Sequence, residues 1–287
     1  MREHAQHFDP RQIMHNNDFE IFHYKEPRPD TVEVHHHDFY EVYFFLGGEV
    51  EYWVDGKTFH LEPGDLLLIN PMELHRPVVA PDSKTYERIV LWINKDYLES
   101  LSSDTTNLTR CFDTSLPTHT NLIHPKTVNR TTITTRLHDL VKEYYGNDLG
   151  GKLYADGLFL QFMVELNRMA LHSKKPRVQK DEASTLVSQV LTYINEHFSE
   201  ELSLEAIAGK FYISKYHLSH AFSSEVGVSI YRYIILRRLT RACQMLSDGK
   251  SAKEVCVGCG FSDYTSFYRA FKSEYGLSPR DFASGTN

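Results

Sequence analysis

Several features that mark other protein classes are scarce in this chain of 287 residues. It has only four cysteines, which is too few for a disulfide scaffold. No apolar run approaches the ~20 residues that a membrane helix needs, and residues 1–7 lack the apolar core of a signal peptide. These absences predict a cytoplasmic protein with no membrane partner.

The overall composition is that of a globular protein, but its charge is unevenly distributed. Hydrophobic residues make up 41% and charged residues 24%, which excludes a disordered chain, and the length predicts about two domains. Residues 1–180 carry 20 basic and 26 acidic side chains, whereas residues 206–287 carry 11 basic and six acidic ones. A basic face attracts a polyanion such as DNA. A solvated helical surface has the same composition, so charge alone leaves both interpretations open.

Short runs of β-branched and aromatic residues predict strands in the first part of the chain. They cover residues 39–46, 49–54, 66–69 and 88–93. Gly47-Gly48, Asp55-Gly56 and Pro63-Gly64 mark the turns between them. Short strands at about ten-residue spacing are typical of a sandwich or a barrel, and a small barrel can hold one small ligand.

Two motifs in this region resemble those of cupin barrels. The first is His35-His36-His37-Asp38-Phe39-Tyr40-Glu41, with Gly48 seven residues after Glu41. The second is Pro63-Gly64-Asp65 followed by Asn70-Pro71-Met72-Glu73-Leu74-His75. In metal-dependent cupins the positions that match His35, His37, Glu41 and His75 are the metal ligands, so the resemblance implies a functional site here.

This set of side chains allows three interpretations. His35 and His37 face the same side of a strand if one forms here, and imidazoles with a carboxylate suit Zn²⁺, Fe²⁺ or Mn²⁺. Cupin-like sensors also keep the pattern without a metal and bind a small molecule, and the histidines can be purely structural. We predict a ligand site without a cofactor; any metal would be held by His35, His37, Glu41 and His75. The predicted ligand-binding residues are His35, His37, Glu41, His75, Tyr43 and Trp53.

The hydrophobic period becomes helical beyond residue 126. Two apolar sets at three- and four-residue spacings predict two helices: Leu137, Leu140, Val141 and Tyr144, then Tyr154, Leu158, Phe162, Leu166 and Met169. Residues 126–173 are therefore expected to form a helical hairpin that packs on the barrel and supplies a dimer interface. The polar, basic residues 174–183 are the predicted linker.

The last hundred residues predict a series of capped helices. Helix starts are marked by Ser203, Ser214, Ser229, Ser251 and Asp263, and helix ends by Gly227 and Gly276. The order of short helix, turn and second helix occurs over about residues 203–226 and again over about 251–275. A longer helix, residues 229–246, joins the two, which indicates two helix-turn-helix units.

This repeated region resembles the AraC/XylS-family transcription regulators. The signature is Gly260-Phe261-Ser262-Asp263-Tyr264, Phe267-Tyr268-Arg269-Ala270-Phe271-Lys272 and Gly276-Leu277-Ser278-Pro279. The resemblance covers residues 184–284, and a cupin-like sensor in front of it is the family's commonest arrangement. One position departs, since Ala283 stands where the family usually has an arginine. The resemblance implies double-stranded DNA, a small-molecule effector, a second copy of the chain and, for an activator, RNA polymerase as partners.

The resemblance also implies which side chains face DNA. A recognition helix enters the major groove with its N-terminal half near the base edges. The matching residues are Tyr216, Ser219 and His220 in the first unit, and Thr265, Ser266 and Arg269 in the second. Arg269 is the strongest candidate, because a guanidinium can bond guanine O6 and N7 together. Lys215 and Lys272 are expected to hold phosphates.

The Cys256-Val257-Gly258-Cys259 sequence has the C-x-x-C spacing of a metal-binding pair but is not interpreted as one. It has no second cysteine pair and lies in the turn of the second helix-turn-helix unit, so we interpret both cysteines as small buried residues and not as a zinc site.

Together these patterns predict an α+β multidomain chain. Residues 1–125 form a cupin-like β-barrel with an N-terminal arm, residues 126–173 the hairpin, and residues 184–287 an all-α domain with two helix-turn-helix units. The predicted function is a sequence-specific DNA-binding activator, not an enzyme, controlled by a sugar or sugar derivative. The alternatives are a metal-dependent cupin enzyme fused to a DNA-binding domain, and a constitutive DNA-binding dimer.

Overall fold

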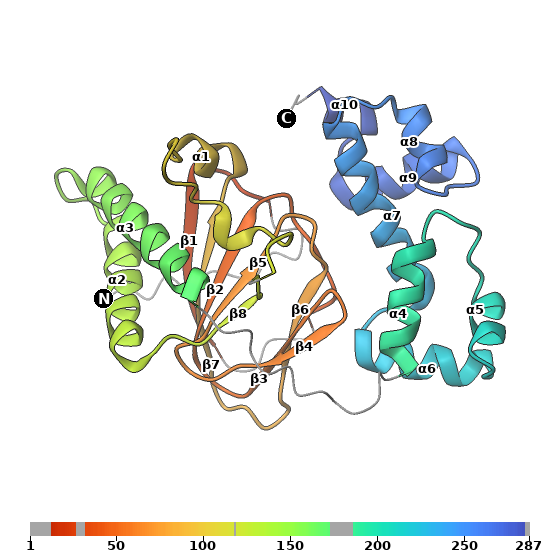
Figure 1. The fold of residues 1–287 in the computed structure, drawn as a ribbon, viewed down its shortest axis with the longest axis horizontal. Helices are drawn as coiled ribbons and strands as arrows, with labels where there is room; N and C mark the ends of the chain where they lie inside the picture. The colour runs from red at the N-terminus through yellow and green to blue at the C-terminus, as the bar shows by residue number, and fades with distance from the viewer. Residues whose placement is uncertain (1–12, 27–31, 118, 173–185, 285–287) are drawn as a thin grey trace. The chain divides into compact units, whose positions relative to one another are not determined.

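The computed structural model describes residues 13–26, 32–117, 119–172 and 186–284. The chain divides into two compact units, Met1–Lys180 and Asp181–Asn287 (Figure 1). Within the described ranges, none of the helices combines the length and the apolar content needed to cross a bilayer. The predicted linker, residues 174–183, and residues 1–12 of the predicted arm lie outside the described residues.

The described residues of the first unit contain two antiparallel sheets as well as helices. The larger has the order β1-β7-β2-β5-β8, with β1 at Phe19–Glu26, β2 at Tyr40–Gly47, β5 at Leu66–Ile69, β7 at Tyr86–Ile93 and β8 at Leu122–Ile123. The smaller has the order β4-β3-β6, with β3 at Val50–Val54, β4 at Lys57–His60 and β6 at His75–Val79. Asp55 and Gly56 join β3 to β4, both with positive φ, as the predicted tight turn requires.

The larger sheet is buried on both faces, which explains its nearly continuous hydrophobic strands. On β5, Leu66 and Leu68 pack in one cluster with α2 (Thr127–Tyr144) and α3 (Gly151–His172). Leu67 and Ile69 point the other way, into an interior cluster shared with the smaller sheet. Figure 1 shows the two helices side by side outside the larger sheet, while the smaller sheet closes its other face. The interior between the sheets is where a ligand site can form.

The hairpin packs on the sheet as predicted, but the buried face of α3 differs from the expected one. Phe162 and Leu166 are buried, whereas Tyr154 is 61% exposed. The remaining buried positions include Phe159 and Met163. The spacing of Tyr154 from Leu158 fits a helical stripe and predicts an inward position. In the first half of α3, however, the buried positions include Ala155 and Phe159, one residue later.

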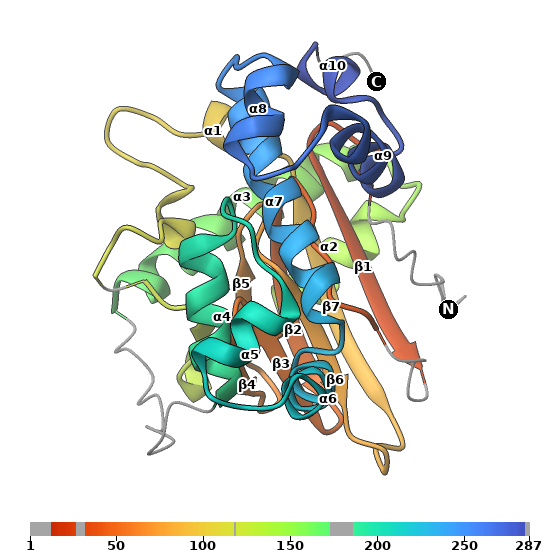
Figure 2. The ribbon, with the colours of Figure 1, turned by 90° about the vertical axis from the view of Figure 1, so that its right-hand side faces the viewer.

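The second unit contains seven helices among its described residues. They are α4 (Leu186–His197), α5 (Leu204–Lys210), α6 (Lys215–Val226), α7 (Ile230–Ser247), α8 (Ala252–Gly258), α9 (Tyr264–Tyr275) and α10 (Pro279–Ala283). Helices α5 and α6 form one helix-turn-helix unit and α8 and α9 the other, with α7 running between them (Figure 2).

Helix caps fix where each recognition helix begins and ends. The Ser214 hydroxyl accepts from the His217 N–H at the start of α6, and the Asp263 carboxylate accepts from the Ser266 N–H at the start of α9. Gly227 and Gly276 end these helices with φ of 91° and 74°. The cap positions predicted from the sequence are confirmed.

Equivalent aromatic residues anchor the two helix-turn-helix units. Phe222 in α6 and Phe271 in α9 are fully buried, and so is Phe267, one turn before Phe271.

The two cysteines of the C-x-x-C sequence, Cys256 and Cys259, are buried as predicted. Burial raises the pKa of Cys259 to about 11, so it remains a thiol at neutral pH.

Candidate ligand cavity and nucleic-acid interface

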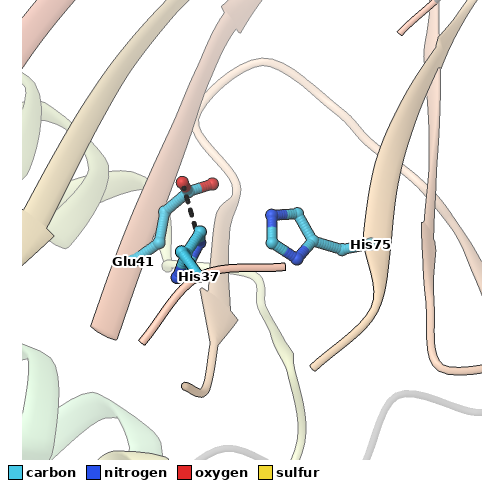
Figure 3. Close-up of side chains that lie close together, drawn as sticks. All are labelled: His37, Glu41 and His75. Carbon is cyan, nitrogen blue, oxygen red and sulfur yellow. Dashed lines mark ion pairs between the residues drawn. The ribbon is translucent and has the colours of Figure 1, made fainter. Parts of the chain in front are cut away.

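The predicted histidines and carboxylate come together between the two sheets. One ligand atom from each of His37, Glu41 and His75 lies within 4.8 Å of the others, and all three residues are buried (Figure 3). His35 joins them, because its ring centroid is 4.3 Å from that of His75. His35 forms only an isolated β-bridge with His75, so the two predicted histidines share a side of an extended segment and not of a regular strand.

Backbone carbonyls select one tautomer for all three rings. The Nδ1 of His35 and that of His37 each lie 2.9 Å from a carbonyl oxygen, and the Nδ1 of His75 lies 2.8 Å from one. Because a carbonyl only accepts, each Nδ1 carries the hydrogen and each neutral ring keeps a lone pair on Nε2. Burial lowers the pKa of His35 to about 4 and that of His75 well below its usual range. The rings of His35 and His75 are therefore neutral at physiological pH.

Glu41 is held in place by the interior aromatics. Its Oε2 accepts from the indole N–H of Trp92 at 2.9 Å, and its Oε1 lies 3.5 Å from the hydroxyl of Tyr52. The same Oε2 is 3.4 Å from Nε2 of His37. Trp92 and Tyr52 thus fix the orientation of the Glu41 carboxylate, which lies next to the imidazole of His37.

This donor set fits a divalent transition metal. The buried Nε2 atoms of His37 and His75 have no hydrogen-bond partner among the described residues, and the Nε2 of the neutral His75 ring carries a lone pair. Imidazoles with one carboxylate are typical ligands of Zn²⁺, Fe²⁺ and Mn²⁺. The residues that would hold the ion are His35, His37, Glu41 and His75. A bound metal would supply a Lewis acid to an oxygen of a small molecule in the barrel.

A small cavity adjoins this cluster. Its volume is about 30 Å³, and Glu41 and His35 contribute to its wall together with Tyr43. A single water needs about 10–15 Å³ on this measure, so the cavity holds a small polar group. The remaining lining residues are Tyr24, Val32, Tyr52, Pro77, Tyr86, Arg88, Val90 and Trp92.

The structure places Trp53 outside this wall, contrary to the prediction. Successive side chains on a strand face opposite sides. On β3 it is Tyr52, the preceding residue, that lines the cavity and belongs to the interior cluster. The tryptophan in the cavity is Trp92 on β7 instead.

Sequence reasoning also missed Arg88, the buried cation of the cavity. Tyr86, Arg88, Val90 and Trp92 alternate along β7 and all face inward. The predicted strand at residues 88–93 carried this signal, because every second residue of a strand shares one face. Without a partner for that strand, the sequence did not show which face was interior.

In the second unit, α6 and α9 each present an exposed polar face. Thr265, Ser266, Arg269 and Lys272 are exposed on α9, at spacings that place them on the side opposite Phe267 and Phe271. On α6 the exposed residues are Lys215, Tyr216 and His220, with Ser219 half-buried beside them. All eight predicted DNA-facing side chains are therefore at least partly accessible.

These side chains differ in how far they are already engaged. The Ser266 hydroxyl donates to the Asp263 carboxylate at 2.7 Å, and Lys215 pairs with Glu205 at 2.9 Å. The Arg269 side chain is exposed, and its guanidinium makes no hydrogen bond or ion pair among the described residues. Arg269 thus offers all its donors to a partner, whereas Ser266 contributes to the helix cap.

Comparison with known proteins agrees with this geometry. A family model described as an AraC-like ligand binding domain matches residues 16–163, just over half of the chain, and one described as a helix-turn-helix domain matches residues 207–285. The chain therefore belongs to the AraC/XylS family and is a DNA-binding transcription regulator with a ligand-binding domain. This confirms the family resemblance and the two-part fold class predicted from the sequence.

Individual relatives are more distant. The HTH-type transcriptional activator RhaS from Escherichia coli is 24% identical over 260 residues, which cover 90% of each chain. The C-terminal domain of AraT, a response regulator from Geobacillus stearothermophilus, is 29% identical and covers 36% of this chain and 86% of its own, with a TM-score of 0.35. Wild-type ToxT from Vibrio cholerae, in a structure with a bound unsaturated fatty acid, is 12% identical, covers 95% of this chain and 97% of its own, and has a TM-score of 0.39.

Proposed function

We propose that this regulator reads DNA with α6 and α9 under the control of a small molecule bound between its two sheets. The observation that carries the proposal is the pair of exposed polar faces on equivalently capped and anchored helices. A helix fixed in this way can place base-reading side chains in a major groove with little loss of conformational entropy on binding.

The exposed residues divide by chemistry into two roles. Arg269 is proposed to contact guanine, and Thr265, Tyr216, Ser219 and His220 to contact base edges or thymine methyl groups. Lys272 and Lys215 are proposed to hold phosphates; Lys215 would exchange its exposed pair with Glu205 for DNA at small cost. Ser266 is left to stabilise the start of α9.

The effector is proposed to be a small polar molecule such as a sugar or sugar derivative. Tyrosine hydroxyls, the Glu41 carboxylate and His35 supply polar groups to the cavity wall, and Trp92 supplies an aromatic face. At about 30 Å³ the cavity admits only part of a sugar, so binding of a whole sugar requires side chains to move. Such a rearrangement would link ligand binding to a change elsewhere in the protein.

Activation is proposed as the direction of control, with RNA polymerase as the partner. The support is RhaS, whose name describes it as a transcriptional activator and which aligns over 90% of this chain.

A homodimer is proposed to form through α3. Leu153 is 79% exposed, and Leu160 and Leu171 are also exposed on this helix. Leu160 follows Leu153 by seven residues, half-buried Val164 follows Leu160 by four, and Leu171 follows Val164 by seven. Apolar residues at spacings of four and seven are typical of the interface between two packed helices. A second copy of α3 would cover this stripe.

The experiment that tests effector control measures DNA affinity of the full chain with and without ligand. Candidate sugars, sugar acids and divalent metals are first screened by thermal unfolding, and each hit is added to a DNA-binding titration. A hit that changes the DNA affinity supports the proposal. Hits that leave it unchanged favour the constitutive dimer, and turnover of a hit in the presence of metal favours the cupin enzyme.

A further inference from the structure

The buried arginine of the cavity specifies a charge for the ligand. We propose that Arg88 binds a carboxylate, so that the effector is a small organic acid, such as a sugar acid, and not a neutral sugar. This inference rests on the proposed function, because it names the ligand class of the same cavity.

Arg88 is a buried charge held by aromatic rings. It is 4% exposed, and its guanidinium carbon lies 4.5 Å from the ring centroid of Tyr24 and 4.0 Å from that of Tyr86. An arginine stays charged in proteins, and burying a charge is costly unless its hydrogen bonds are made. The rings hold the guanidinium at the cavity wall by cation–π contact but accept no full hydrogen bond from it.

The guanidinium has donor capacity left over. Its Nη2 donates to Oε1 of Glu26 at 2.8 Å. Its Nη1 is buried and has no hydrogen-bond partner among the described residues. A carboxylate is the group that matches a guanidinium best, because two oxygens can meet two N–H groups in one plane. Arg88 thus offers a buried guanidinium, already held in place, to which a carboxylate can bind.

A tyrosine hydroxyl beside Arg88 favours the same kind of ligand. The Tyr43 hydroxyl donates to the Tyr86 hydroxyl at 2.6 Å, which leaves the hydrogen of Tyr86 for another acceptor. Burial raises the pKa of Tyr86 to about 12, so this hydroxyl remains a donor at physiological pH. Arg88 and Tyr86 together present donors to the cavity, and an ionised carboxylate, which only accepts, satisfies both.

Size and charge limit the acid further. A carboxylate group is of the size that a cavity of about 30 Å³ admits without displacing side chains. Glu26 and Glu41 are also near the cavity, and each adds a negative charge. A singly charged carboxylate is therefore favoured over a doubly charged phosphate, which these two groups would repel more strongly.

Matched pairs of probes test the proposal on the full chain. Thermal unfolding and calorimetric titration compare acetate with acetamide and D-galacturonate with D-galactose. We expect the acid of a pair to bind the wild type and its neutral partner not to bind. Arg88→Met is expected to weaken acid binding by about tenfold or more, since a hydrogen bond to a charged group is lost. Glu26→Gln is expected to strengthen it, because the guanidinium loses its internal carboxylate.

The outcomes separate this proposal from the sensor function. Neutral probes that bind while acids do not would overturn the role of Arg88 and leave effector binding standing. If no probe binds, both proposals fail for these ligand classes. An Arg88→Met variant that fails to fold leaves Glu26→Gln as the test, and unchanged or weaker acid binding in that variant refutes the proposal.

Discussion

Replacing Arg269 by alanine should weaken binding to the specific DNA site far more than binding to random DNA. The guanidinium is exposed, unengaged by any described residue and placed near the start of α9, where it can reach guanine O6 and N7. A bidentate contact of this kind contributes about 1–3 kcal/mol, so the dissociation constant for the specific site should rise by about 5- to 150-fold. On random DNA the change removes only one of several basic charges.

Two variants control for the loss of charge. Arg241→Ala removes an exposed arginine on α7 whose Nη1 donates to Gln244 at 3.2 Å. Lys272→Ala removes the proposed phosphate contact on the same helix as Arg269. Fluorescence anisotropy measures the DNA affinity of Arg269→Ala, Arg241→Ala and Lys272→Ala at several salt concentrations, on the specific site and on a scrambled duplex. Lys272→Ala should lower the salt slope by about 1 on both duplexes.

The base-reading role of Arg269 is refuted by equal fold losses on the two duplexes. It is also refuted if Arg241→Ala reproduces the effect, because the loss would then follow net charge and not position. A lower salt slope for Arg269→Ala, with no change in base preference, would assign the residue to a phosphate.

Four further predictions concern metal binding by the donor set, the pH dependence of stability, the dimer and the packing of the second unit. If His35, His37, Glu41 and His75 hold a divalent ion, Zn²⁺ or Mn²⁺ at about 100 times its Kd should raise the melting temperature by about 5–10 °C in the wild type and not in His75→Ala. In the folded protein the pKa of His35 is lowered to about 4 and that of His75 is also lowered, so these rings bind protons more readily in the unfolded chain. The free energy of unfolding from urea titrations should therefore be greatest above pH 6.5 and decrease as the pH falls toward 4. Leu160→Glu should yield a monomer in sedimentation velocity, whereas Val128→Glu, on an exposed α2 position, should not. Arg238→Ala should cost about 2 kcal/mol in urea unfolding followed by circular dichroism, because its guanidinium donates to two backbone carbonyls at 2.8 Å.

Much of the fold could be predicted because its signals are local. The caps at Ser214, Asp263 and Gly276 act within one helical turn, so the residue type alone marks where each helix begins or ends. The strands β2, β3, β5 and β7 are apolar and were recognised. Four strands of the described residues were not predicted. Strand β4 (Lys57–His60) is short and polar, β8 has two residues and no period, and Pro77 interrupts the run of β6. Strand β1, Phe19–Glu26, was also missed although most of it is buried.

The candidate cavity was only partly predictable because it depends on contacts between distant strands. The motif residues His37, Glu41 and His75 were identified from their resemblance to cupins, and the structure brings them together. Trp53 was misplaced and Arg88 missed because a single strand shows an alternation but not which face is interior. That choice is made by pairing, here of β7 with β1 and β2.

The most direct test of DNA reading by two helices is selection of bound duplexes from a random pool by the full-length protein. If α6 and α9 each enter a major groove on one face of the duplex, the enriched site has two short elements about one helical turn, or about 10–10.5 base pairs, apart. Selection with Arg269→Ala should then degrade one element and keep the other. A single enriched element, or no enrichment, would contradict the proposal that both helices read DNA.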